Sequence, residues 1–98
     1  MHRGTTPIHI FRTDVDLTNA SVLFITYKQK GKIVLEKSIE EVTIQGEIVT
    51  VSLSQKETLL FTEGIVTIQI RVKFPDGSTI ASNLIRTSAY EILKEGEI

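Results

Sequence analysis

The chain has 98 residues, 41% of them hydrophobic, and its 11 basic and 12 acidic residues give a formal net charge of −1 at pH 7. Typical domains run to about 100–150 residues, so we expect a single domain over residues 1–98. The apolar fraction excludes a disordered chain. The sequence has no cysteine, which excludes disulfides and thiolate metal sites. A balanced charge also lacks the strongly basic face of a nucleic-acid binder, so no nucleic-acid partner is expected.

Short strands are predicted along most of the chain. The clearest runs from Ile65 to Phe74, where apolar and polar residues alternate with the period of a half-buried strand. It ends in the turn sequence Pro75-Asp76-Gly77-Ser78, which predicts an antiparallel hairpin with the segment that follows. In chain order the predicted strands are residues 7–12, 21–28, 33–37, 42–44, 48–53, 65–74 and 79–90.

One segment favours a helical turn instead of a strand. Ser54-Gln55-Lys56-Glu57 matches a capping box, in which the serine hydroxyl and the glutamate carboxylate bind backbone N–H groups at the start of a helix. Leu59, Leu60 and Phe61 follow, and Gly64 ends the run. We expect a single turn that crosses between two sheets, with its leucines closing one end of the molecule.

About seven short strands with turn signals every 8–12 residues are typical of a sandwich. We therefore predict an all-β fold, an immunoglobulin-like two-sheet β-sandwich with one short helical turn; a small open barrel is the alternative. The side chains predicted to face the core are Leu23, Ile25, Val49, Val51, Val66, Ile68, Ile70, Val72 and Phe74.

The predicted strand over residues 21–28 is apolar on both faces. Leu23, Ile25 and Tyr27 share one face, and Val22 and Phe24 share the other. Since a strand of an antiparallel sandwich normally keeps one face in water, the second face needs a cover. Either a protein partner, including a second copy, contacts Val22 and Phe24, or the N-terminal arm or the helical turn covers them.

Four lysines gather around one predicted turn: Lys28, Lys30, Lys32 and Lys37. We interpret them as solvated residues that keep a sheet edge soluble.

No constellation in the sequence indicates catalysis, a cofactor or a metal. The two histidines are isolated, His2 in the N-terminal arm and His9 within the first predicted strand. Asp14 and Asp16 have the alternate spacing of calcium ligands but lack the other oxygen ligands and the glycine of a calcium loop. Glu40 and Glu41 are adjacent, so they point to opposite faces if the chain is extended there. We therefore expect no enzyme, no cofactor and no small-molecule ligand.

Carbohydrate or surface binding is the alternative function, because β-sandwiches often carry aromatic platforms that stack on sugar rings. The chain has no tryptophan and two tyrosines, Tyr27 and Tyr90, of which Tyr27 is predicted to face the core. The phenylalanines are also predicted to be buried.

Neither a signal peptide nor a membrane span is predicted. The segment from Met1 to Pro7 lacks an apolar core and a cleavage site, and no apolar run approaches the roughly 20 residues that cross a bilayer. We expect no membrane partner, and a location in the cytoplasm or within a larger particle.

Three stretches carry a resemblance: Arg3 to Pro7, Leu53 to Leu59, and Asp76-Gly77 with Ala81-Ser82-Asn83 and Ile85-Arg86. Together they resemble small, uncharacterised proteins carried by prophages and mobile elements of Gram-positive bacteria. The resemblance implies a phage or prophage setting, incorporation in a phage particle as the alternative to the cytoplasm, and a virion- or tail-associated role, and it implies no active site. The expected function is a non-enzymatic structural or protein-interaction module that binds a protein partner or self-associates.

Overall fold

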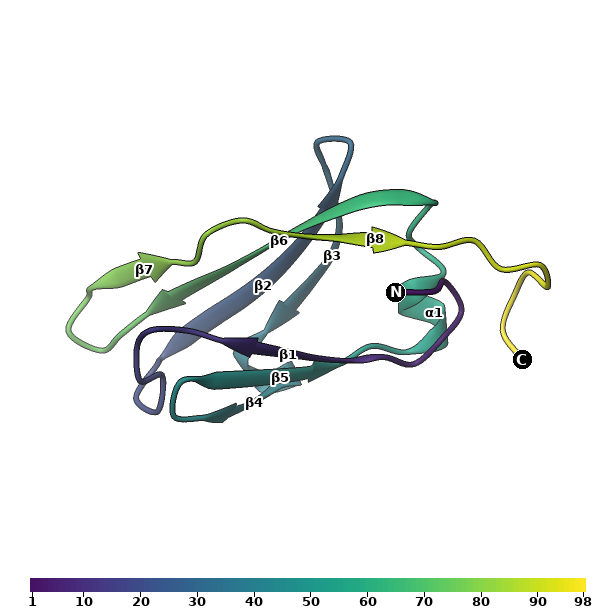
Figure 1. Ribbon diagram of the computed structural model, residues 1–98. Helices are drawn as coiled ribbons and strands as arrows, with labels where there is room; N and C mark the ends of the chain where they lie inside the picture. Colours follow the sequence, from purple (N-terminus) through teal and green to yellow (C-terminus); the bar gives the residue numbers. More distant parts are fainter.

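A computed structural model describes all of residues 1–98 (Figure 1). The chain forms eight strands with two short helical turns between them. The strands are β1 Ile8–Arg12, β2 Val22–Gln29, β3 Lys32–Ser38, β4 Val42–Gln45, β5 Ile48–Ser52, β6 Gly64–Lys73, β7 Thr79–Ala81 and β8 Ile85–Ala89. A 3-10 turn, Ile39–Glu41, joins β3 to β4, and α1, Gln55–Thr58, joins β5 to β6.

The strands form two antiparallel sheets. One has three strands in the order β1-β5-β4, and the other has five, in the order β3-β2-β6-β7 with β8 also paired to β6. Because β2 occupies one side of β6, both β7 and β8 lie on the other side, end to end. The larger sheet is therefore four strands wide, while the smaller one is three strands wide.

The prediction of an all-β, two-sheet sandwich of about seven strands is confirmed. The strand order differs in one respect from that of immunoglobulin constant domains, where the second strand pairs with the fifth. Here β2 lies between β3 and β6 and forms the centre of the larger sheet.

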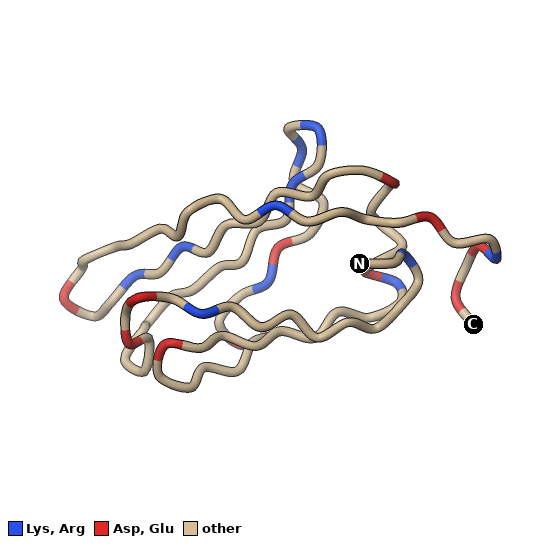
Figure 2. The backbone as a smooth tube through the Cα atoms, in the orientation of Figure 1, with Lys and Arg blue, Asp and Glu red and all other residues tan.

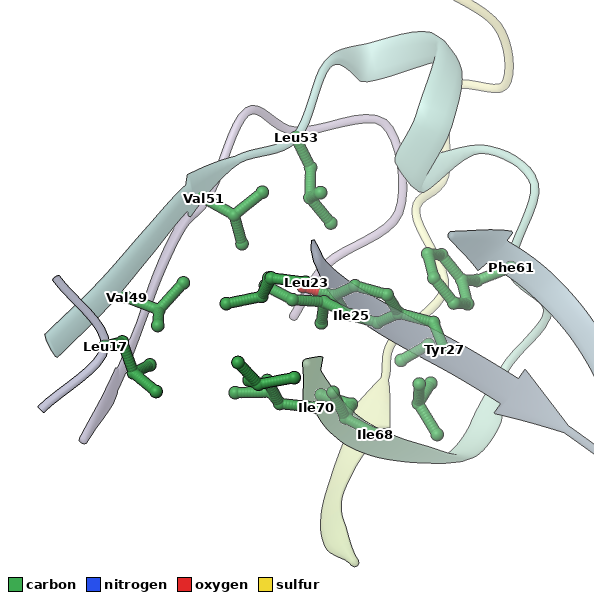
Figure 3. Close-up of a cluster of buried hydrophobic side chains, with 13 residues drawn as sticks. Leu17, Leu23, Ile25, Tyr27, Val49, Val51, Leu53, Phe61, Ile68 and Ile70 are labelled. Atoms are coloured by element: carbon green, nitrogen blue, oxygen red, sulfur yellow. The ribbon is translucent and has the colours of Figure 1, made fainter. Parts of the chain in front are cut away.

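Between the sheets lies a core of 13 buried side chains, most of which are shown in Figure 3. Eight of the nine side chains predicted to face it are buried, and the ninth, Phe74, is half-buried against it. Alternation along the strands identified these residues because a strand shows the same face at every second residue. Leu17 and Phe61 are also fully buried. Leu17 was not among the residues predicted to face the core, because it lies outside the strands, where no alternation marks it. Phe61 was predicted to be buried together with the other phenylalanines, and its burial is confirmed.

The capping box before α1 is confirmed. The Ser54 hydroxyl accepts a hydrogen bond from the Glu57 N–H at 3.1 Å, and the Glu57 carboxylate accepts one from the Ser54 N–H at 2.9 Å. The closing side chain was assigned wrongly to the leucines. Leu60 is exposed and Leu59 half-buried, whereas Phe61 reaches the core and contacts Tyr27 with ring centroids 5.8 Å apart.

The prediction of one continuous strand over residues 79–90 is wrong in its middle. Arg71 pairs with Ala81, whereas Ile68 pairs with Ile85, so the register of this edge shifts by one residue between the two pairs. The extra residue interrupts the strand at Ser82–Leu84 and splits it into β7 and β8. There the Ser82 hydroxyl accepts a hydrogen bond from the Ile70 N–H at 3.0 Å.

Candidate interaction surface

Val22 and Phe24 lie on the outer face of the larger sheet, as predicted. Their exposed fractions are 38% and 40%, while Leu23 and Ile25 of the same strand are fully buried. In the pairing of β2 with β6, Val22 is opposite Lys73 and Phe24 is opposite Arg71. The expectation that the phenylalanines are buried is therefore wrong for Phe24, which alternation places with Val22.

A shallow hollow of about 250 Å³ lies beside these two side chains. Its wall is completed by Thr26, Glu36, Arg71 and Lys73, among other residues. An apolar floor with a charged rim is the arrangement of residues found at protein interfaces.

The covering segments considered from the sequence lie elsewhere. The N-terminal arm pairs with the end of β8, where the Arg3 N–H donates to the Tyr90 carbonyl at 3.0 Å. The helical turn α1 contacts this arm through Thr58, whose hydroxyl donates to the Thr5 carbonyl at 2.9 Å. No residue of either segment lines the hollow beside Val22 and Phe24, so these side chains stay open to a partner.

Charge is distributed unevenly over the molecule, as Figure 2 shows. Basic residues gather along the larger sheet and its β2–β3 hairpin, and most acidic residues lie in the connections and the C-terminal segment. By their place in the register, Lys28, Arg71, Lys73 and Arg86 share the outer face with Val22 and Phe24. The local field on this face is positive although the net charge of the whole chain is −1.

Three of the four clustered lysines, Lys28, Lys30 and Lys32, are exposed as expected. The interpretation is wrong for Lys37, which is 7% exposed. Its Nζ lies 2.6 Å from the Glu57 carboxylate and 3.5 Å from that of Glu41. Burial alone would raise the pKa of Glu57, but the Lys37 ammonium and the Ser54 N–H outweigh it and hold that pKa below its usual value.

His9 is half-buried and has a partner inside the sandwich. Its Nδ1 lies 2.8 Å from the Tyr27 hydroxyl. Burial lowers the pKa of His9, with a smaller contribution from the positive N-terminus, and burial raises the pKa of Tyr27, with a contribution from Glu57. Both groups are therefore neutral near pH 7, and the tautomer of the imidazole sets which of the two donates the hydrogen bond.

The two tyrosines differ in accessibility. Tyr27 is fully buried and cannot stack on a sugar ring. Tyr90 is exposed, and its ring centroid lies 5.2 Å from that of His2.

The two acidic pairs singled out from the sequence, Asp14/Asp16 and Glu40/Glu41, lie in turns and connections of the chain. The Asp16 carboxylate accepts hydrogen bonds from the N–H and the hydroxyl of Thr18, at 2.9 and 2.5 Å. Asp14 is exposed, Glu40 lies in the 3-10 turn, and Glu41 pairs with Lys37. The structure brings together no group of three or more histidine, aspartate or glutamate side chains that could hold a metal ion.

Sequence reasoning missed a second exposed apolar pair. Ile8 and Ile10 of β1 are 63% and 68% exposed on the outer face of the smaller sheet. The signal was present in the alternation of β1, where the two isoleucines alternate with His9 and Phe11. The periodicity alone does not say which of the two faces is buried.

Searches of protein-family models, curated proteins and solved structures for relatives of this chain find no match. No helix in the structure has both the length and the apolar character needed to cross a membrane.

Proposed function

We propose that the protein is a non-enzymatic structural or protein-interaction module of a phage or prophage, associated with the virion or tail. It binds its protein partner through the outer face of the larger sheet, around Val22 and Phe24. The observation that carries this proposal is the exposure of these two adjacent apolar side chains on a positively charged sheet face.

Solvation favours a partner on this face. When a partner covers an apolar side chain, the free energy of binding gains roughly 25 cal/mol for every Å² of apolar surface removed from water. Phenylalanine is also among the residues enriched at the centres of interfaces. The basic rim of Lys28, Arg71 and Lys73 favours a partner with acidic groups around an apolar centre, because complementary charges guide association.

The phage setting is supported by the resemblance carried by residues 3–7, 53–59 and 76–86. The fold is compatible with it, since small β-sandwiches present faces and edges to neighbouring subunits in many assemblies. A fold of this kind serves many functions, so the function is assigned by the surface residues.

The interaction is tested first by the mass of the protein in solution. Size-exclusion chromatography with light scattering, at two protein and two salt concentrations, separates a monomer from an assembly. If the partner is a second copy, a stable oligomer forms and Phe24→Asp dissociates it. The matched control is Ile65→Asp, a change at a 65% exposed residue of the same sheet. An oligomer unaffected by Phe24→Asp would contradict the assignment of this face.

If the wild-type protein is a monomer, the partner is another protein. After induction of the prophages of the source strain, particles purified by density gradient should contain the protein, and Phe24→Asp should remove it from them. Finding the wild-type protein only in the soluble fraction would refute the virion role.

A further inference from the structure

The two sheets differ in width, and this leaves a groove along one side of the sandwich. A hollow of about 540 Å³ lies between β1 and the edge formed by β7 and β8. Its apolar walls are formed mainly by Phe11, Ile70, Val72, Ile80 and Ile85. Ile70 and Val72 of β6 are almost fully buried, but Ile80 and Ile85 at the edge of the larger sheet are only half-buried. The groove therefore lies where a fourth strand of the smaller sheet would cover the edge of the larger one.

The edge of β1 that borders the groove has unpaired backbone groups. At the two ends of the β1–β5 ladder, the Leu53 N–H donates to the Pro7 carbonyl and the Thr13 N–H donates to the Glu47 carbonyl. In an antiparallel pair, residues bonded to the partner strand alternate with residues whose N–H and C=O point away from it. Since Pro7 and Thr13 face β5, the backbone groups of Ile8, Ile10 and Arg12 point outward, to the unpaired side.

The other sheet edges carry features that discourage pairing. At β3, a bulge leaves Val34 unpaired, and the exposed Lys32 begins the strand. The β7–β8 edge is interrupted by the register shift, and β4 has four residues. By contrast, β1 is regular over five residue pairs, and Arg12 at its end is its one formal charge at pH 7. Bulges, lysines and short length are the usual protections of an edge strand, and β1 has none of the three over its regular length.

We propose that this groove accepts an extended segment of a partner protein, which pairs with β1 as the fourth strand of the smaller sheet. Its alternate side chains are apolar and cover Ile80 and Ile85, and its backbone bonds to Ile8, Ile10 and Arg12. It carries an acidic residue beside Arg12, whose guanidinium forms no ion pair within this chain. The mode is strand addition, in which backbone bonds provide affinity and alternate side chains provide specificity.

The chemistry of the groove favours a polypeptide occupant. The exposed backbone of β1 presents N–H and C=O groups at every second residue, about 6.6 Å apart, a spacing that another extended chain matches. The occupant must also be a free segment and not β1 of a second folded copy. That copy would bring its own β6, which β1 covers, into the space that β7 and β8 already occupy.

This inference deepens the proposed function by naming a second surface and the chemistry of its partner. It uses neither Val22 nor Phe24, so its failure and that of the proposed function are distinguishable.

The test is fluorescence anisotropy with a labelled seven-residue probe peptide that alternates valine and threonine, with one threonine replaced by glutamate. The matched control peptide has the same side chains but N-methyl groups at the positions that would donate to β1. We expect the N-methylated peptide to bind at least about ten-fold more weakly, because it loses two or more backbone hydrogen bonds. Equal binding of both peptides would overturn strand addition.

Two protein variants locate the binding. Ile10→Pro should weaken binding of the probe, because it removes one outward N–H of β1. It removes no bond to β5, and an edge strand tolerates proline where its N–H faces solvent. Arg12→Glu should weaken binding of the probe, and should restore binding of a peptide with lysine in place of the glutamate. This charge-swap readout does not depend on the stability of the proline variant. If Arg12→Glu changes the affinity for neither peptide, the occupant is not aligned with β1 as proposed.

Amide hydrogen exchange then identifies the occupied surface. The N–H groups of Ile8, Ile10 and Arg12 should exchange quickly in the free protein and slowly with the probe peptide. Protection around Val22 and Phe24 instead would place the peptide on the other face and refute the groove. Protection of β1 that rises with protein concentration in the absence of peptide would show that a second copy is the occupant, and would refute the partner named here.

Discussion

At the scale of single residues, Gly4 has a conformation that its surroundings require. Its φ is +68°, in the left-handed region that favours glycine, and a Cβ there would lie 2.8 Å from the Ile92 side chain. The neighbouring Arg3 guanidinium donates to the carbonyls of Phe61 and Leu59, at 2.5 and 3.2 Å, and pairs with Glu95 at 2.7 Å. The N-terminal arm thus joins the end of α1 to the C-terminal segment.

We predict that Gly4→Ala destabilises the protein slightly more than Gly46→Ala, because the tip of the half-buried Ile92 side chain must shift to admit the new Cβ. Both glycines have positive φ, but a Cβ at Gly46 meets no atom within 4 Å. The backbone cost, about 1–2 kcal/mol for a left-handed residue, is common to both variants. The difference between their losses of stability therefore measures the effect of the contact with Ile92. Urea denaturation of the two variants measures it. A smaller loss for Gly4→Ala than for Gly46→Ala would contradict the close approach.

At the scale of the element, β6 is the strand that contacts most of the larger sheet. It pairs with β2 on one side and with β7 and β8 on the other, and Val66, Ile68, Ile70 and Val72 all face the core. Its ten residues also include the exposed Ile65, so one strand offers both a buried and an open isoleucine.

Ile68→Asp should lower the free energy of unfolding by several kcal/mol, roughly 3–5, because it places an unpaired carboxylate in the core. Ile65→Asp should change it by less than about 0.5 kcal/mol, as is usual for exposed positions. Thermal melts with chemical denaturation compare the two. A larger loss for Ile65→Asp than for Ile68→Asp would mean that the strand faces the core with its other side.

Elements with a strict period of two could be predicted from the sequence. All six strands between residues 7 and 74 were placed within one or two residues, and the same alternation places Val22 and Phe24 together on one face of β2. The break between β7 and β8 could not be predicted, because a one-residue register shift depends on the partner strand. The burial of Lys37 likewise depends on Glu57, which is distant in the sequence and adjacent only in the fold.

At the scale of the whole molecule, the ion pair between Lys37 and Glu57 connects β3 to the turn that crosses between the sheets. Lys37 is nearly buried, so it depends on this carboxylate, which also caps α1. The pair is therefore coupled to the closure of one end of the sandwich.

This coupling predicts acid lability. The pKa of Glu57 is lowered in the folded protein, so the stabilisation is complete above the unfolded value, about 4.3, and is lost as the pH falls through the lower folded value. Glu57→Gln should reduce stability at pH 7 by about 1.5–3 kcal/mol, the range for hydrogen bonds to charged groups. The difference in melting temperature between the wild-type protein and Glu57→Gln should disappear as the pH falls toward 3. A difference that does not change with pH would show that the charge of Glu57 is not the cause.

The sequence by itself determined the all-β class, which residues of a strand share a face, the capped turn and the pairing of Val22 with Phe24 on one face, because these depend on neighbours in the chain and on a local period. The tertiary structure decided which face of β1 is open, how Lys37 is paired, and that three strands lie against a sheet four strands wide. These features arise from contacts between distant residues and from the count of strands in each sheet, neither of which has a local pattern. The groove beside β1 belongs to this second class, and only the packing of the two sheets reveals it.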